Sequence, residues 1–263
     1  MSPEAISDPT EGRIAILGAG PVGLDAALAA VDAGRPFRLY ELAPHPAGNI
    51  RLWGHVKLFT PWEMNVSPRM RRHMEAAGDE VPDNDVCPTG DELCDRLLDP
   101  VAALPSIAPN LRTATRVVGV ARSGLLKHQE IGTEERARHP FRLVLRGPDG
   151  KEWTEEAAAV IDATGTYSEA NALGDGGVPA PGEWAASRRI LRTIPDVSSE
   201  PSSWAGKRLL VVGAGHSAQT AIRDLAELVA EHGDTRVVWA LKREEPEFEL
   251  DPDDPLPDRS ALT

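Results

Sequence analysis

Two short glycine clusters contain the residues of this sequence whose types and spacing could do chemistry. The first, Gly18-Ala-Gly20-Pro-Val-Gly23, follows an apolar run and precedes a segment rich in alanine and leucine. Between a strand and a helix, the first glycine permits a tight turn, the second lets the backbone approach a pyrophosphate, and the third lets the helix pack on the strand. The N-terminus of the helix then offers free N–H groups to the phosphates. The sequence therefore predicts a dinucleotide-binding turn formed by Gly18, Gly20, Pro21, Val22 and Gly23.

An acidic residue stands where the next predicted strand ends. Glu41 follows the apolar run 37–40 and lies 18 residues after Gly23. A carboxylate at this place can accept hydrogen bonds from ribose hydroxyls, and it would repel a 2′-phosphate. The first site is therefore expected to bind FAD or NAD.

The second cluster repeats this pattern 195 residues later with two differences. Gly213-Ala-Gly215-His-Ser-Ala218 has alanine at the third position, and the strand that follows its helix ends in Lys242-Arg243. Cations at that place attract a 2′-phosphate, so the second site suits NADPH, with His216, Ser217 and Ala218 in its turn. The alternative for Lys242 and Arg243 is a solvated pair at the end of a strand.

The segments around the clusters predict an α/β fold. A Rossmann-like domain with a small β-meander at about 115–156 is expected first, followed by the first βαβ unit of a second Rossmann-like domain. Residues 42–86 are rich in proline, glycine, tryptophan and methionine and are expected to be irregular. The predicted strands are 13–17, 37–40, 115–121, 141–146, 151–154, 157–163, 208–212 and 235–241, and the predicted helices are 24–31, 92–104 and 219–231.

Composition excludes several classes of protein. With 28 Lys and Arg against 41 Asp and Glu, the formal net charge of −13 argues against a general nucleic-acid binder. Apolar runs are far shorter than the ~20 residues that span a bilayer, and Met1–Gly12 is too polar for a secretory signal. Cys87 and Cys94, seven residues apart, form neither a Cys-x-x-Cys pair nor a zinc framework. We expect a cytoplasmic protein without metal or membrane, with reduced thiols.

Two dinucleotide motifs in this order, joined by Asp162-Ala-Thr-Gly165, resemble the two-domain flavoproteins that bind FAD and NADPH. Within them the chain is most similar to the flavin-containing monooxygenase group, over most of residues 12–243. The resemblance implies that the first turn and Glu41 bind FAD and that the second turn binds NADPH. It also implies that Gly48 and Asn49 lie along the FAD phosphates and that the backbone of Val117 meets the adenine. The chain would leave the FAD domain at Ala163, Thr164 and Gly165.

The resemblance also places the segment 51–65 around the isoalloxazine ring of FAD. Candidate neighbours of the ring are Arg51, Trp53, Thr60, Trp62 and Asn65. The side-chain amide of Asn65 could donate to a flavin oxygen, which makes it the candidate catalytic residue. The alternative is an ordered loop packed by its tryptophans, and His55 in this loop is equally open to a structural role.

Two departures from the family pattern bear on function. An aromatic–Gly stretch followed by His is missing from the linker, which has Arg192-Thr193 where His-Ser is expected. Residues 207–263 contain only the first βαβ unit, which would leave sheet edges exposed. The expected division is therefore an FAD domain at 1–167, a linker at 168–206 and an incomplete NADPH domain at 207–263. We expect an N-terminal part of a longer protein or a fragmentary reading frame, or a partner that supplies the missing strands.

The resemblance implies an FAD-dependent, NADPH-using monooxygenase. Such an enzyme inserts one atom of molecular oxygen into a small-molecule substrate through a C4a-(hydro)peroxyflavin, and needs no metal and no side-chain nucleophile. One alternative is an FAD/NADPH dehydrogenase or reductase without oxygen insertion, for which the missing Cys-x-x-Cys disfavours a disulfide acceptor. The other alternative is a non-catalytic FAD-binding fragment. The sequence specifies neither the substrate nor the oligomeric state.

Overall fold

The chain forms two compact units that interleave along the sequence. The computed structural model describes residues 12–167, 169–242 and 256. The first unit comprises 1–51, 62–86 and 91–165, and the second comprises 52–61, 87–90 and 166–263. The second unit thus takes two short segments from the first half of the chain. The predicted division at residues 167 and 206 stays a prediction.

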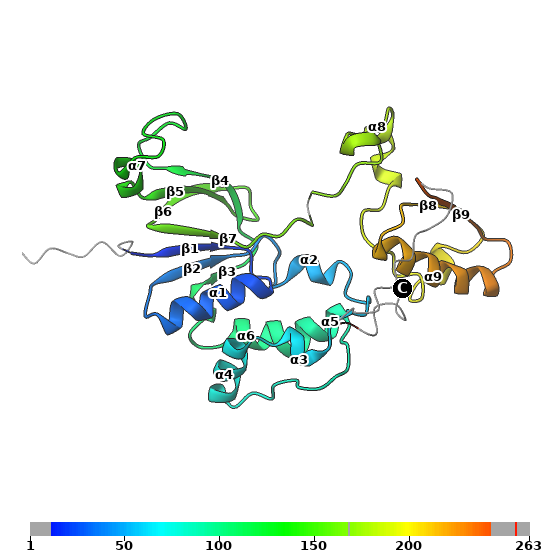
Figure 1. Ribbon diagram of the computed structural model, residues 1–263, viewed down its shortest axis with the longest axis horizontal. Coiled ribbons are helices and arrows are strands. Elements are labelled where there is room, and N and C mark those ends of the chain that lie inside the picture. Colours follow the sequence, from blue (N-terminus) through cyan, green and yellow to red (C-terminus); the bar gives the residue numbers. More distant parts are fainter. Residues whose placement is uncertain (1–11, 168, 243–255, 257–263) are drawn as a thin grey trace, which may run out of the picture. The chain divides into compact units, whose positions relative to one another are not determined.

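A parallel sheet forms the centre of the first unit (Figure 1). Its order is β3-β2-β1-β7, and each neighbouring pair is parallel. The α-helix α1 (Pro21–Asp32) leads from β1 to β2. This arrangement confirms the predicted Rossmann-like α/β fold. The strands are β1 (Ile14–Leu17), β2 (Phe37–Tyr40), β3 (Leu111–Arg112) and β7 (Ala159–Asp162).

The two faces of this sheet are covered by different layers. Side chains alternate along β1, so Ile16 faces one side while Ala15 and Leu17 face the other. Figure 1 shows α1 on one face and the strands β4, β5 and β6 on the opposite face. Ala15, Leu17 and Tyr40 form one core cluster with Leu143 and Leu145, both fully buried. The fold is therefore held by apolar burial on both faces of β1.

An antiparallel meander supplies the second layer, as predicted. It consists of β4 (Arg116–Arg122), β5 (Phe141–Arg146) and β6 (Glu152–Ala157), in the order β4-β5-β6. The short helix α7 (Glu134–Arg138) lies in the connection between β4 and β5. Tyr40 Oη donates to the Glu155 carboxylate over 2.8 Å. Burial and this bond raise the pKa of Tyr40, so its phenol stays protonated.

The prediction of an irregular segment over 42–86 is wrong. Three helices lie there: α2 (Gly48–Arg51), α3 (Trp62–Asn65) and α4 (Pro68–Ala77). Ser67 caps α4 by accepting from the amide of Met70 over 3.0 Å, and Gly78 ends it in a left-handed conformation. Met70 and Met74, four residues apart, are buried on one face of α4. This helical spacing and both caps are present in the sequence, but they stand among arginines and prolines that conceal the pattern.

The predicted helix over 92–104 is continuous but contains a wide turn. It runs as α5 (Gly90–Leu93), the π-helical turn η1 (Cys94–Leu98) and α6 (Asp99–Ala103), and the 3-10 turn η2 (Ala108–Asn110) follows. Pro100 lacks an N–H and would clash with an ordinary α-turn, and the wide turn precedes it directly. No helix among the described residues is both long and apolar enough to cross a membrane.

The second unit contains the predicted βαβ element. Strands β8 (Arg208–Val212) and β9 (Arg236–Ala240) are parallel and joined by α9 (His216–Glu231). Leu225 and Leu228 of α9 cover one face of this pair, where Leu209 and Val237 pack against them. The preceding segment contains the short helices η3 (Asp175–Gly177), α8 (Glu183–Ala186), η4 (Ser187–Arg189) and η5 (Pro201–Ser203).

A buried carboxylate holds part of this segment together. Glu183 accepts hydrogen bonds from the amides of Leu173 (3.0 Å) and Ala180 (2.8 Å), and it forms an ion pair with Arg192. Arg192 also donates to the carbonyl of Asn171 over 2.6 Å. The bond from Arg192, followed by the backbone bonds, lowers the pKa of Glu183. Arg192, one of the two residues at the place where the resemblance leads us to expect His-Ser, thus has structural contacts here.

Replacing Glu183 should loosen this segment. In Glu183→Gln the acceptor loses its charge and one oxygen becomes a donor. We expect the amide protons of Leu173 and Ala180 to lose protection against hydrogen exchange. Because the pKa of Glu183 is lowered, the unaltered protein should keep this protection above the ordinary glutamate pKa and lose it as the pH falls through the lowered value. Exchange measured by NMR tests both expectations. Glu169→Gln, at an exposed acid of the same segment, is the control, and equal protection in both variants would contradict the assignment.

Candidate dinucleotide-binding sites

Close packing at two glycines sets the shape of the first turn. Gly18 has a φ of +93°, and a Cβ there would lie 2.6 Å from the carbonyl oxygen of Ala163. A Cβ on Gly23 would overlap the carbonyl oxygen of Gly18. Only glycine fits at either position, so α1 begins directly against the end of β1.

The side of the turn at Gly20 is open. Gly20 is the N-cap of α1, no side chain caps the helix, and nothing lies within 4 Å of where a Cβ would stand. Pro21 occupies the first helical position and Val22 is exposed. The first N–H groups of this 12-residue helix therefore lack an internal acceptor, beside a glycine at which a Cβ would meet no atom within 4 Å.

The Glu41 carboxylate is fixed beside this turn. Its Oε2 accepts from the amide of Ala19 over 2.8 Å, and its Oε1 accepts from the amide of Ala43 over 2.9 Å. The backbone of Glu41 donates to the carbonyl of Arg112 (2.9 Å) and accepts from the amide of Thr115 (2.8 Å). Glu41 is 8% exposed, and each carboxylate oxygen keeps a further lone pair for a ligand hydroxyl.

The loop after Glu41 returns to the same turn. The amide of Ala47 donates to the carbonyl of Ala19 over 3.0 Å. Gly48 and Asn49, predicted to lie along the phosphates, are the first residues of α2 directly after Ala47. The structure thus brings the first glycine cluster, Glu41 and Gly48 together, although 25 residues separate Gly23 from Gly48.

The predicted crossing turn lies against Gly18. The amide of Ala163 donates to the carbonyl of Leu17 over 2.9 Å. The Asp162 carboxylate accepts from the hydroxyl (2.7 Å) and the amide (3.1 Å) of Thr164, and these bonds lower the pKa of Asp162. Gly165 follows directly and ends the first unit. Val117, predicted to meet the adenine through its backbone, lies at the start of β4 with its side chain against the core of the meander.

The candidate ring neighbours in the first unit already have structural contacts. Trp62 is 2% exposed and lies under the guanidinium of Arg96, 5.2 Å from the ring centre. Arg51 forms ion pairs with Asp99 (2.6 Å) and Asp95 (3.4 Å). Asn65 is half-buried at the end of α3. The contacts of Trp62 fit the alternative interpretation, in which the tryptophan packs an ordered loop. The predicted contacts of these three residues with the flavin ring stay predictions.

The candidates in the second unit lie on the segment 52–61. Trp53 stacks on Tyr167 with ring centres 6.0 Å apart, and Thr60 is half-buried. The ring nitrogens Trp53 Nε1 and His55 Nε2 are buried and have no hydrogen-bond partner among the described residues. Phe59 lies against His216 of the second turn, with ring centres 5.3 Å apart. The segment 52–61 and the second turn therefore belong to one unit.

Two side chains that the sequence analysis missed fix the second turn. Trp239 Nε1 donates to the carbonyl of Gly213 over 2.7 Å, and Gln219 Nε2 donates to the carbonyl of Ala214 over 2.9 Å. Gly213 has a φ of +113°, and nothing lies within 4 Å of a Cβ at Gly215. Both carbonyls are thus tied to the protein, which leaves the N-terminal amides of α9 for a ligand. No spacing rule marks Trp239 or Gln219, because their partners are set by the tertiary fold.

The remaining predicted residues of the second site lie at its two ends. His216, Ser217 and Ala218 form the first turn of α9. Lys242 follows β9, is almost fully exposed, and approaches Asp175 at 3.6 Å. Arg243 lies outside the described residues.

Solved structures share the fold of this chain. A bacillithiol disulfide reductase, Bdr (YpdA), from Bacillus cereus is 19% identical, with a TM-score of 0.66 over 95% of this chain and 64% of that one. A flavin-containing monooxygenase from Stenotrophomonas maltophilia is 20% identical, with a TM-score of 0.55 over 89% and 58%. The fold is the Rossmann-like fold of these flavoproteins. A complex of OTEMO with FAD and NADP shares it at 16% identity, with a TM-score of 0.56 over 89% of this chain and 39% of that one.

This chain resembles these three proteins in its fold, and the similarity covers only part of each of them. The chain spans less than two thirds of the length of each of these three proteins. Its sequence matches no protein-family model and no curated protein.

Two glycine variants should separate folding from binding at the first turn. Gly23→Ala places a methyl group on the Gly18 carbonyl and should destabilise the protein by about 1–3 kcal/mol. Gly20→Ala meets no atom within 4 Å, so it should change the unfolding temperature little while its methyl group obstructs the approach of a pyrophosphate. Thermal unfolding and retention of a dinucleotide check the pair. A Gly23→Ala protein as stable as the unaltered one would contradict the packing argument.

Proposed function

We propose that this chain is the dinucleotide-binding part of a flavoprotein oxidoreductase that binds FAD at the first turn and NADPH at the second. The observation that carries the proposal is the Glu41 carboxylate, which two backbone amides hold beside an open glycine turn. A buried carboxylate costs free energy unless it is bonded, and this one keeps acceptor capacity for ribose hydroxyls. Among the structural relatives, OTEMO forms a complex with FAD and NADP.

The residues present fit FAD at the first turn. The open space at Gly20 and the uncapped start of α1 would receive the pyrophosphate, and Glu41 would accept from the adenosine ribose. When bound, FAD supplies a two-electron acceptor that takes hydride from a nicotinamide and passes the electrons onward. The residues of this chain would bind the FAD, orient it and shield it from solvent.

The second turn fits a phosphorylated dinucleotide. The amides at the start of α9 would face its pyrophosphate. Leu241 directly follows β9, as Glu41 directly follows β2, and Lys242 is the next residue. A cation there attracts the 2′-phosphate that distinguishes NADPH from NADH. The second site therefore lacks the carboxylate that would repel a 2′-phosphate and has a cation at the next position.

The finer form of the proposal is a monooxygenase. The overall reaction of such an enzyme converts a substrate, molecular oxygen, NADPH and a proton into the oxygenated substrate, water and NADP⁺. The alternative is a reductase, in which NADPH and a proton reduce another acceptor. Both classes occur among the structural relatives. Both cysteines are buried. Burial raises the pKa of the Cys94 thiol to about 11, which disfavours a thiolate at Cys94 for a disulfide acceptor. Oxygen uptake that gives an oxygenated product, and not hydrogen peroxide, during NADPH oxidation distinguishes the two forms.

Replacing Glu41 tests the FAD site. Glu41→Gln removes the charge that would hold the ribose hydroxyls, and loss of a charge-assisted hydrogen bond of about 1.5–3 kcal/mol should weaken FAD binding by roughly tenfold or more. Titration of the full chain with FAD, followed by flavin fluorescence, measures this. Glu75→Gln, at an exposed acid of α4, should bind FAD as the unaltered protein does. Absence of FAD binding in the unaltered protein would refute the proposal.

Replacing Lys242 tests the nucleotide preference of the second site. Lys242→Ala should weaken NADPH binding by roughly threefold to tenfold and leave NADH binding unchanged, because only NADPH carries the 2′-phosphate. Calorimetric titration with both nucleotides gives the two affinities. Arg236→Ala, at the opposite end of β9, is the control. An equal loss for NADPH and NADH would contradict the assigned role.

A further inference from the structure

Two arginine side chains of the central sheet in the first unit converge on one backbone carbonyl. Arg38 lies on β2, and Arg112 lies on the neighbouring outer strand β3. Arg38 Nη1 lies 3.3 Å and Arg112 Nη1 lies 3.2 Å from the carbonyl oxygen of Pro109. Arg112 Nη1 also donates to the carbonyl of Leu111 over 3.0 Å. The two positive charges of this arginine pair, Arg38 and Arg112, therefore share a neutral acceptor.

The arginine pair brings like charges together at a partly desolvated place. Arg38 is half-buried, and its Nε is buried without a hydrogen-bond partner among the described residues. Burial, followed by the charge of Arg112, lowers the pKa of Arg38. Arg112 is exposed, so a solute can approach the pair from its side. An anion beside both guanidinium groups would offset their repulsion and replace the lost hydration of Arg38.

The carboxylate of Glu155 lies in this region but is bonded to other groups. It accepts from Tyr40 Oη over 2.8 Å and from Trp153 Nε1 over 3.1 Å, and Arg13 Nη2 approaches it at 3.5 Å. Within the part of the chain that the structure describes, no ion pair joins Glu155 to Arg38. Arg13 and the arginine pair together outnumber this carboxylate, so the region has a positive charge although the whole chain has a net charge of −13.

We propose that the arginine pair is a binding site for a phosphate group, which accepts from the guanidinium donors that the Pro109 and Leu111 carbonyls leave free. Guanidinium groups match the oxygens of a phosphate in geometry. A phosphate monoester has a charge of about −1.5 to −2 at neutral pH, close to the two charges of the pair, whereas a carboxylate has only one. The site does not depend on the proposed function, because neither arginine belongs to the glycine motifs or to the loop after Glu41.

Titration of the full chain with inorganic phosphate, followed by NMR, tests the site. The backbone amide signals of Arg38, Leu111 and Arg112 should shift along one saturation curve, which separates this site from anion binding at the glycine turns. In Arg38→Ala and in Arg112→Ala the dissociation constant read from the Leu111 signal should rise roughly tenfold or more, as expected for a lost charge-assisted hydrogen bond. Arg112 is exposed, so its variant should fold, and circular dichroism spectra check both variants.

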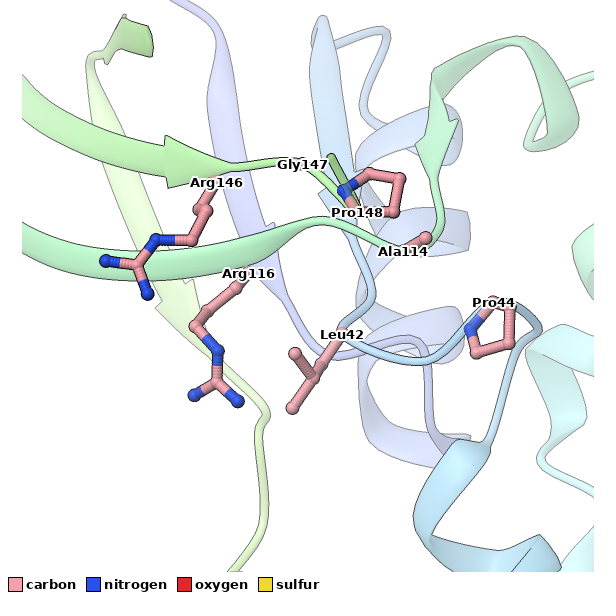
Figure 2. A pocket seen from close by; sticks show the side chains of 7 residues that line it. All are labelled: Leu42, Pro44, Ala114, Arg116, Arg146, Gly147 and Pro148. Atoms are coloured by element: carbon pink, nitrogen blue, oxygen red, sulfur yellow. The ribbon is translucent and has the colours of Figure 1, made fainter. Parts of the chain in front are cut away.

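Arg146→Ala is the matched control, because it removes the same charge from another place in the first unit. Figure 2 shows the Arg146 side chain at an open pocket that is also lined by Leu42 and Arg116. The carboxylate of Glu152 holds its guanidinium, with Nη2 at 2.6 Å and Nε at 2.9 Å from one oxygen. The affinity of the arginine pair for phosphate should therefore stay unchanged in this variant.

Titrations with O-phosphoserine and acetate define the ligand. Phosphoserine that binds at least as tightly as inorganic phosphate would support a phosphate ester as the ligand, and weaker binding of phosphoserine would support the free ion. Acetate, with a single charge, should bind roughly tenfold more weakly than phosphate or not at all, and equal affinity for acetate would overturn the phosphate class. Phosphate shifts that never saturate in the unaltered protein would overturn the site. An equal loss of affinity in Arg146→Ala would overturn it as well, because general charge would then explain the binding.

Discussion

The two hydrogen bonds that the Glu41 carboxylate accepts are the interaction on which the arrangement of the first unit depends. One oxygen holds the glycine turn through Ala19 and the other holds the following loop through Ala43. The backbone of Glu41 meanwhile joins Arg112 and Thr115. The glycine turn at Ala19, the loop at Ala43 and the segment that contains Arg112 and Thr115 thus meet at one residue. A nearly buried carboxylate is stable only when it is bonded in this way, so the fold and the candidate site share one requirement.

Steric fit places a second constraint on the same region. Gly18 and Gly23 leave no room for a methyl group, whereas Gly20 and Gly215 face open space. Glycines with the same spacing therefore serve different ends: some let the protein pack on itself, and others leave the backbone accessible. The second turn replaces the tight third glycine with Ala218 and gains two side-chain donors, Trp239 and Gln219, that hold its carbonyls.

Local patterns predicted most of the fold. The bounds of β2 and β8 follow from short apolar runs between turn residues, and the hairpin of β5 and β6 follows from the turn residues at 147–150. The helix α4 escaped prediction because its two buried methionines stand among charged residues. The partners of Glu183, Trp239 and Gln219 could not be predicted, since each bond joins groups that only the tertiary structure brings together. The spacing of the glycines indicated the candidate sites, but the contacts that hold Glu41 join it to Ala19 and Thr115, which only the tertiary structure brings together.

The interleaving of the two units limits how this molecule can be dissected. The chain passes from one unit to the other after residues 51, 61, 86, 90 and 165. A cut at residue 165, the obvious place for separating two Rossmann-like domains, would leave the segment 52–61 attached to the wrong part. Trp53 would lose Tyr167, and Phe59 would lose His216. Recombination with a related chain at a single crossover would meet the same obstacle, because the segment 52–61 and the second turn would then come from different parents.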